Sequence, residues 1–428
     1  MRSSGEQESG KYIVSRIYIR NEGPSMDRNW LRSAAKRYDE SNRATLEFIL
    51  SRKPLMGAFV DTKVHSISGE NYDGTSGIRG PKFTFGWIQA RALEALITFT
   101  HFYSDRDLSL SRRLTDRAKL LFEGLDALFK RDGHVYFLYD SDLNPVFETA
   151  GSTIRQQIEP SIFTYSDAFA AKGLFAASRV FAPEQSSAYL NYLLSVIESV
   201  EDGRFQMNET IPISRQSLSE QADDFGPRMI LLGAAGLLHR HGETTNTNFA
   251  NRFIDYVFER HYHAQTGLLL NVPKDDTCNV GHAIELCGFG FEHLQAIPDD
   301  TRLHKLVSVL VQSLQVGLQG PGIALYLSAK TGRATSEYYP WWPMPEAIRA
   351  CALGMHLDPS LDLFNLWKKC DHTFFNNYWQ KEKGFAVQTR DLLGPVDFVP
   401  ATPDLDPGYH TGLSLLGAAQ TIDGFLKK

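Results

Sequence analysis

The 428-residue sequence predicts an all-α protein folded as an (α/α)6 barrel, or toroid, with short β-hairpins in the inter-helix loops. Apolar residues recur at three- and four-residue spacing in twelve segments, as they do on one face of a helix. Short connections alternate with longer ones that hold extended stretches near Gly or Asp. This pattern is typical of six inner helices around a central pocket and six outer helices around them. An open helical solenoid is the alternative, and it would lack a closed pocket.

The expected helices, in chain order, are 26–52, 86–103, 108–130, 160–181, 184–201, 218–240, 246–263, 282–296, 300–318, 342–356, 359–378 and 409–426. Pro54 and Gly57 end the first of them. The range 57–84 is Gly-rich and predicts a loop and a hairpin. Further extended pieces are expected at 133–140, 203–212, 266–273 and 383–391.

No linker interrupts the pattern after its polar start. We expect an N-terminal polar segment at 1–25 and a single barrel domain at 26–428. The run from Pro395 to Pro407 predicts a long loop, and long loops in a compact domain are commonly functional.

Composition and charge exclude several classes of function. The net charge is −6 without long runs of one sign, which argues against a nucleic acid or an anionic membrane as partner. The N-terminus has no apolar signal region, and no apolar run is long enough to span a membrane. The four Cys lack CxxC spacing, which favours reduced thiols in the cytoplasm over disulfides or a zinc site. No Gly-rich phosphate loop is present, so a nucleotide or redox cofactor is not expected.

The stretch NVGHAIE, at 279–285, is the first candidate for chemistry. If a helix begins here, His282 and Glu285 share a face, because residues three apart are neighbours. A carboxylate beside an imidazole selects its tautomer and raises its basicity, as a general acid or base requires. A cap or a surface pair is the plainer interpretation.

The stretch FGWIQARALE places Trp87, Gln89 and Arg91 at the start of an apolar helix. An Arg among apolar residues is costly unless it is paired. Two interpretations stay open: an ion pair with Glu94 at i+3, or a guanidinium that faces a polar pocket and binds an oxyanion or a sugar hydroxyl.

Two further helix starts carry unusual residues. In YYPWWPMPEA, two Trp precede Glu346, and an aromatic face beside a carboxylate suits a sugar. The pattern is explained equally well if the two Trp only pack in the core and Glu346 interacts favourably with the helix dipole.

In DPGYHTG, Gly408 and His410 repeat the Gly–His start seen at His282. Both imidazoles would then face one cavity.

Together these residues resemble the N-acylglucosamine 2-epimerase superfamily over most of the chain. The family's W-x-Q-x-R matches residues 87–91, its NPGHxxE matches 279–285, its KLWWPxxEA matches 339–347 and its late (Y/F)H matches 409–410. The helix with Tyr165 is similar to the family's Y-x-x-AF helix, and residues 226–238 are similar to its PMxLL helix.

The resemblance implies an (α/α)6 barrel without a metal or cofactor. It implies that His282 and His410 are an acid/base pair that inverts C2 of an aldose or an N-acylhexosamine through a cis-enediolate. Arg91 would stabilise the enediolate oxygen, and Glu285 would orient His282. The expected sugar-binding residues are Glu346, Trp342, Trp87, Gln89, Tyr165 and Asp224. The expected partner is a monosaccharide or amino sugar, and family analogy favours a homodimer.

Three departures from the family pattern bear on specificity. Val280 replaces the Pro of NPGH, and Tyr339 replaces the Lys before the Trp pair. Cellobiose epimerases and mannose isomerases carry a further His, which the corresponding stretch at 226–230 lacks. This favours the N-acyl branch or a divergent monosaccharide branch. We find no sequence basis for activation by a nucleotide.

Three alternative functions remain open. An aldose–ketose isomerase would use the same site. A glycoside hydrolase or lyase on the same toroid would need two carboxylates across the pocket, for which Asp167 and Asp224 are the candidates. A non-catalytic sugar-binding protein is the third.

Overall fold

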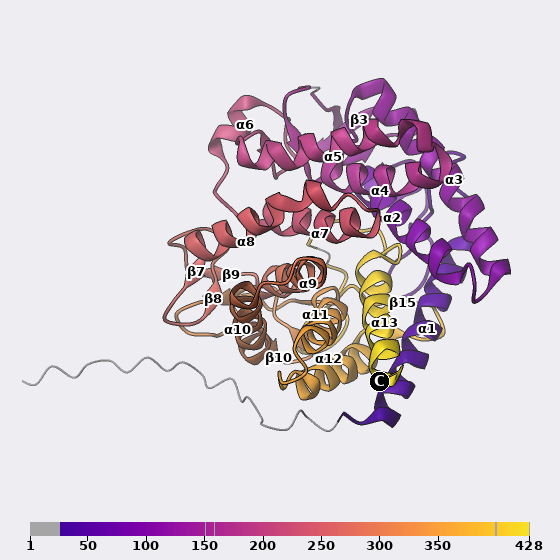
Figure 1. Ribbon diagram of the computed structural model, residues 1–428. Helices are drawn as coiled ribbons and strands as arrows, with labels where there is room; N and C mark the ends of the chain where they lie inside the picture. The colour runs from indigo at the N-terminus through magenta and orange to yellow at the C-terminus, as the bar shows by residue number, and fades with distance from the viewer. Residues whose placement is uncertain (1–25, 150, 158, 399, 428) are drawn as a thin grey trace, which may run out of the picture.

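Thirteen α-helices make up most of the described residues, which in this computed structural model are 26–149, 151–157, 159–398 and 400–427. Six of them form an inner ring: α2 (Gly86–Tyr103), α4 (Tyr165–Phe181), α7 (Gly226–Arg240), α9 (Val280–Ala296), α11 (Pro343–Leu357) and α13 (Ser414–Lys427). Six pack around them: α1 (Arg28–Ser51), α3 (Leu108–Asp132), α5 (Ser186–Glu201), α8 (Asn248–Arg260), α10 (Asp300–Gly317) and α12 (Phe364–Asn377). Figure 1 looks along the axis of this double ring.

Burial separates the two rings. Helix α2 is buried over almost every position, whereas α3 buries one stripe that includes Leu114, Leu121 and Leu128. A helix that is apolar all round belongs in an interior, and one with a single apolar stripe belongs at a surface. One continuous hydrophobic core extends from Leu31 on α1 to Phe425 on α13.

Most strands are only two residues long, and all lie in the connections. One sheet has the order β1 (Thr84–Phe85), β2 (Leu138–Tyr139), β3 (Pro145–Thr149), β4 (Ser152–Arg155), and it is antiparallel throughout. A parallel pair joins β5 (Phe163–Thr164) to β6 (Phe205–Gln206). The antiparallel pairs are β7 (Tyr262–His263) with β8 (Leu268–Leu269), β9 (Thr277–Cys278) with β12 (Leu327–Ser328), β10 (Leu318–Gln319) with β11 (Gly322–Ile323), β13 (Tyr339–Pro340) with β16 (Thr389–Arg390), and β14 (Trp379–Gln380) with β15 (Phe385–Ala386).

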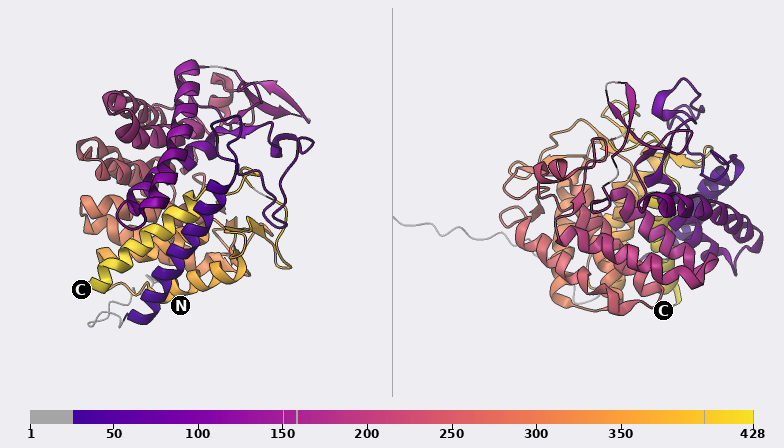
Figure 2. Two further views of the ribbon diagram at one scale, coloured as in Figure 1. Left: turned by 90° about the vertical axis from the view of Figure 1, so that its right-hand side faces the viewer. Right: turned by 90° about the horizontal axis from the view of Figure 1, so that it is seen from above.

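The strands and long loops gather at one end of the barrel, and the C-terminus of α13 lies at the other (Figure 2). The inner helices begin at this loop-rich end. Their first turns therefore point unpaired backbone N–H groups, and the positive ends of their dipoles, toward the same region.

The predicted (α/α)6 barrel with short hairpins is confirmed. The solenoid alternative is wrong, because the first helix, α1, packs against the last, α13. The prediction of one helix over 218–240 is also wrong: a short helix α6 (Arg215–Glu220) ends before α7 begins at Gly226. Asp224 accepts a hydrogen bond from the Gly226 N–H, and Pro227 follows, so the chain carries a helix-start signal inside the predicted segment. The polar segment at 1–25 lies outside the described residues.

The four cysteines are buried and unpaired, as their spacing predicted. Within the described residues, none of the helices combines the length and the apolar character that crossing a membrane requires.

Gly86 at the start of α2 provides a test of this packing. Its N–H donates to the Phe137 carbonyl, and a Cβ at this position would come within 2.2 Å of the Tyr136 carbonyl oxygen. We expect Gly86→Ala to destabilise the protein by about 1–3 kcal/mol, because the backbone must move to relieve the overlap. Thermal unfolding followed by circular dichroism measures the effect.

Gly394→Ala is the matched control, since a Cβ there meets nothing within 4 Å. Its melting temperature should equal that of the unchanged protein. Equal melting temperatures for both variants would contradict the tight approach of α2 to residues 136–137.

Candidate active site

A cavity of about 250 Å³ opens among the starts of the inner helices. It is lined by first-turn residues of the inner helices and by loop residues from 400 to 407. Seven of the ten predicted site residues line it: Trp87, Arg91, Tyr165, His282, Glu285, Trp342 and His410. The other three, Gln89, Asp224 and Glu346, lie behind its wall or beside it.

His282 lies in the first turn of α9. The side chain of Asn279 caps this helix by accepting a hydrogen bond from the His282 N–H at 3.2 Å. Gly281 admits the Trp342 indole, which a Cβ would meet at 2.5 Å. The imidazole lies 5.5 Å from that ring, between centroids, and its Nδ1 has no hydrogen-bond partner in the part of the chain that the structure describes. Burial lowers the pKa of His282, so the imidazole is uncharged at neutral pH, as a general base requires.

His410 is held by a π-helical turn, Tyr409–Leu413, which precedes α13. The turn begins after Gly408, whose φ of 87° is left-handed and suits glycine. Both carboxylate oxygens of Asp406 accept backbone N–H groups of this turn, including that of His410 at 3.2 Å. The His410 ring lies 5.6 Å from Trp342, so the two histidines contact the same indole.

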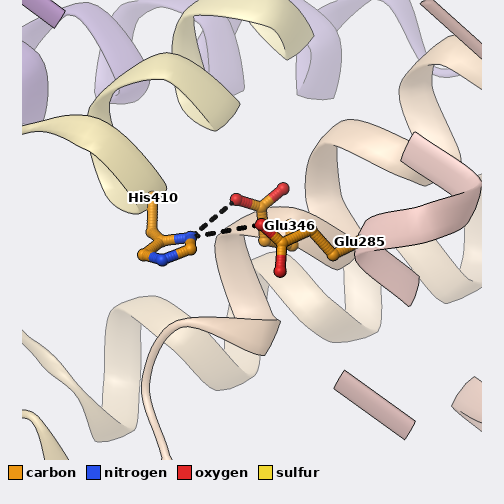
Figure 3. A group of neighbouring side chains, drawn as sticks. All are labelled: Glu285, Glu346 and His410. Atoms are coloured by element: carbon orange, nitrogen blue, oxygen red, sulfur yellow. Dashed lines mark hydrogen bonds and ion pairs between the residues drawn. The ribbon is translucent and has the colours of Figure 1, made fainter. Parts of the chain in front are cut away.

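Two carboxylates face His410 Nδ1. Glu346 Oε1 is 3.0 Å away and Glu285 Oε1 is 3.9 Å away, while the other ring nitrogen points away from both (Figure 3). Burial opposes ionisation of Glu346, but Arg349 and His410 outweigh it and lower the pKa of this carboxyl. An ionised Glu346 accepts a hydrogen bond from the Nδ1–H of His410, which leaves the far nitrogen of His410 for chemistry.

The predicted pairing of Glu285 with His282 is wrong. Among the described residues, Glu285 Oε1 and His282 Nδ1 both lack a hydrogen-bond partner, and the carboxylate points at His410. The reason is that Glu285 lies one helical turn deeper in the barrel than His282. At that depth the π-helical turn places His410 next to it. Glu346, predicted to hold the sugar, does not line this cavity and binds His410 from behind its wall.

Glu285 is a carboxyl group in an unusual environment. Burial raises its pKa to about 7, nearby Glu346 adds to the rise, and His410, Arg349 and Arg91 oppose it. Together with Glu346 and His410 it offers donor atoms within 4.8 Å of one another, a grouping that could hold a cation. Arg349 already lies 2.6 Å from Glu346 Oε2 and neutralises that carboxylate.

Arg91 is stacked rather than paired. Its guanidinium lies 4.1 Å from the Phe169 ring centroid, 4.8 Å from Trp87 and 5.3 Å from Tyr409. The alternative ion pair with Glu94 is wrong, because Glu94 pairs with Lys172 at 3.1 Å. Three aromatic rings hold the cation at the cavity wall by cation–π contact, and they leave its N–H groups for an anion.

Gln89 is a correction to the sugar-binding set. The Val60 N–H donates to Gln89 Oε1 at 2.7 Å, and Gln89 Nε2 donates to the Val60 carbonyl at 3.0 Å. Gln89 is two positions from Trp87 and two from Arg91 in the sequence. Its side chain therefore lies on the other side of α2. Trp87 and Tyr165, in contrast, stack at 5.8 Å and 17° and form one wall of the cavity.

Asp224 and Asp167 do not form a carboxylate pair across the cavity. Asp224 accepts hydrogen bonds from the Gly226 N–H and, at 3.1 Å, from the Asn271 amide, while its charge favours protonation of His282. Asp167 closes the capping box of α4 and accepts hydrogen bonds from Tyr192 and His134. Neither residue lines the cavity, and the sugar contact of Asp224 stays a prediction.

Sequence reasoning missed the residues that the loop after β16 supplies. Asp404 lines the cavity and forms an ion pair with Lys63 at 2.8 Å, with each side chain 1% exposed. Thr62 donates to the same carboxylate at 2.8 Å. The Pro-rich composition of 395–407 predicted a functional loop, and residues of this loop do line the cavity. The composition did not indicate which of its residues would do so. Tyr326, also in the lining, had no signal in the sequence.

Comparison with known proteins is informative at the level of structure. No protein-family model and no curated protein sequence matches the chain. A cellobiose 2-epimerase from Bacillus thermoamylovorans B4167 is 14% identical and superposes with a TM-score of 0.71, over 91% of this chain and 99% of that one. A D-mannose isomerase is 12% identical with a TM-score of 0.67, over 90% and 97%. The chain has the fold of these sugar-converting enzymes.

A GH76A α-1,6-mannanase from Salegentibacter sp. HEL1_6 also shares the fold, at 12% identity and a TM-score of 0.52 over 91% and 99% of the two chains. Epimerases, an isomerase and a hydrolase therefore occur on this barrel. The fold that the family resemblance implies is confirmed, and the reaction must be argued from the site.

Glu285 provides a test of the site that does not depend on its reaction. A glutamate in an unfolded chain has a pKa of about 4.3, so the folded protein binds the extra proton between about pH 4.3 and 7. The contribution of Glu285 to stability is present at low pH and is lost as pH rises through this window. We expect Glu285→Gln to raise the free energy of unfolding at pH 8 by about 1–3 kcal/mol and to have little effect at pH 4.5.

Melting temperatures measured between pH 4.5 and 8 test this. Glu40→Gln, at an exposed position on α1, is the control and should follow the unchanged protein at every pH. A Glu285→Gln variant that is less stable at pH 8 would contradict the assignment of Glu285 as a destabilising buried acid.

Proposed function

We propose that this chain is a sugar 2-epimerase of the N-acylglucosamine 2-epimerase superfamily, acting on a free aldose or an N-acylhexosamine. The observation that carries the proposal is the contact of His282 and His410 with the same indole, Trp342, in one cavity. Two bases are what inversion at one carbon needs, because the proton leaves from one face and returns to the other.

The charges around the cavity suit an enediolate. His282, uncharged at neutral pH, can take the C2 proton of the open-chain sugar. His410, whose Nδ1–H is held by ionised Glu346, can deliver a proton from its far nitrogen to the opposite face. Arg91 and the first turns of the inner helices supply positive potential where the oxyanion forms.

Aromatic surfaces support a sugar as the substrate. Trp87, Tyr165 and Trp342 offer apolar faces to the C–H surfaces of the ring. We propose that residues 26–428 form one catalytic domain and that the protein acts on monosaccharides or amino sugars in the cytoplasm, as a homodimer. An aldose–ketose isomerase would use the same residues and differ only in where the second proton arrives.

Incubation of the purified protein with a panel of free aldoses and N-acylhexosamines in D2O tests the reaction class. We expect deuterium at C2 of both epimers, read by NMR, because each base exchanges its proton with solvent. Deuterium at C1 of a ketose would indicate the isomerase instead. Release of reducing ends from oligosaccharides, with no exchange in any free sugar, would favour a hydrolase. No exchange and no release would leave a sugar-binding protein.

Single replacements of the two histidines test the two-base assignment. His282→Asn and His410→Asn should each slow epimerisation by about 10²–10⁴-fold, the usual contribution of a positioned acid or base. Each variant should still exchange the C2 proton of one epimer only, and the two variants should retain opposite epimers. If both variants lost exchange of the same epimer, a single base would be acting. Glu40→Gln, at an exposed position on α1, is the control and should epimerise at the rate of the unchanged protein.

A further inference from the structure

A second cavity lies on the barrel axis behind His410. It measures about 110 Å³ and is lined by polar side chains that include Glu94, Glu292, Glu346 and Arg349. A wider hollow of about 430 Å³ adjoins it, lined by the last turns of the inner helices. Arg240 and Glu292 belong to both. Polar groups therefore extend from the candidate active site to the far end of the barrel.

A chain of ion pairs runs through this region. Arg349 Nη2 lies 2.6 Å from Glu346 Oε2, and Arg349 Nη1 donates to Glu292 Oε1 at 3.1 Å. Glu292 Oε2 lies 3.6 Å from Arg240. The side chains of Glu346, Arg349, Glu292 and Arg240 are 2%, 5%, 18% and 50% exposed, so the series leads from the interior to solvent.

Small residues fix Arg349 and Glu292 in place. A Cβ on Gly288 would lie 3.1 Å from Arg349 Nη2, and one on Gly236 would lie 2.5 Å from Glu292 Oε2. The Phe289 ring supports the guanidinium at 4.4 Å. Larger side chains at these glycines would displace the ion pairs, so the inner helices leave room for them.

The geometry at Arg349 shows what Glu292 does. The two oxygens of Glu346 have different main partners: Oε1 binds His410 and Oε2 faces Arg349, while the Ser414 side chain also contacts this carboxylate. The second arm of the guanidinium is taken by Glu292. Without Glu292, both arms would be available to Glu346, and a bidentate pair would draw Oε1 away from His410. We propose that Glu292 is a positioning residue for His410, acting along the barrel axis through Arg349 and Glu346.

This inference rests on the proposed function, in which His410 serves one face of the sugar. Glu292→Gln should lower kcat about tenfold with KM within about twofold, because a small misplacement of the base weakens catalysis more than binding. The loss should fall on one epimer. C2 exchange of the epimer that His282→Asn still exchanges should slow, and exchange of the other epimer should stay near its original rate. A merely structural role would slow both alike.

Arg349→Lys provides a second variant, because lysine keeps the charge but lacks the planar guanidinium whose two arms face Glu346 and Glu292. It should reproduce the loss for the same epimer. The matched control is Glu243→Gln, which removes a carboxylate paired with Arg179 at 3.8 Å and 26% exposed, without contact to the site. Its kinetics should be unchanged. Wild-type rates in both Glu292→Gln and Arg349→Lys would overturn the proposal.

NMR of protein with ¹⁵N-labelled histidine separates this inference from the proposed function. The Nδ1–H signal of His410, assigned by its loss in His410→Asn, should be protected from solvent exchange in the unchanged protein. In Glu292→Gln it should exchange about tenfold faster, because its hydrogen bond to Glu346 is weakened. This holds even if no sugar in the panel reacts, in which case only the proposed function fails. An unchanged exchange rate in both variants would overturn the inference whatever the protein catalyses.

Discussion

The hydrogen bond between Glu346 and His410 is the contact on which the candidate site depends. The two residues are 64 positions apart and both are buried, so a folded barrel is needed to bring them together. A buried carboxylate stays ionised only with a compensating charge, and Arg349 provides it. The π-helical turn after Gly408 aims the imidazole at the carboxylate. A regular helix from the same start would place His410 at a different angle to the axis.

The barrel collects positive potential where the proposed reaction develops negative charge. Inner helices begin at the loop-rich end, so their dipoles add there, and Arg91 contributes a full charge held by aromatic rings. Glu285 lies in the same region and would oppose this if it were ionised. Burial and Glu346 keep its pKa near 7, which reduces its negative charge at neutral pH. The site therefore combines a strong cation with a carboxyl group that is partly protonated at neutral pH.

The sequence was sufficient to locate the site but not to pair its residues. Helix starts with Trp87, His282, Trp342 and His410 were visible because Gly, Pro and aromatic residues interrupt apolar periodicity. Seven of the ten predicted residues do line the cavity. The pairings failed wherever local spacing was the guide: Glu285 was assigned to His282 and Glu94 to Arg91. Spacing identifies neighbours on one helix, whereas the partners found, His410 and Lys172, come from other helices.

The same reasoning explains why the rear of the site escaped notice. Glu292 and Arg349 look like ordinary helix residues in sequence, and their meaning lies in a contact between α9 and α11. Burying two such charges is expensive, and a hydrophobic pair of similar volume would stabilise the barrel as well or better. Stability alone therefore does not account for them. An arginine that must neutralise Glu346 without drawing it away from His410 needs a second acceptor, and Glu292 occupies that position.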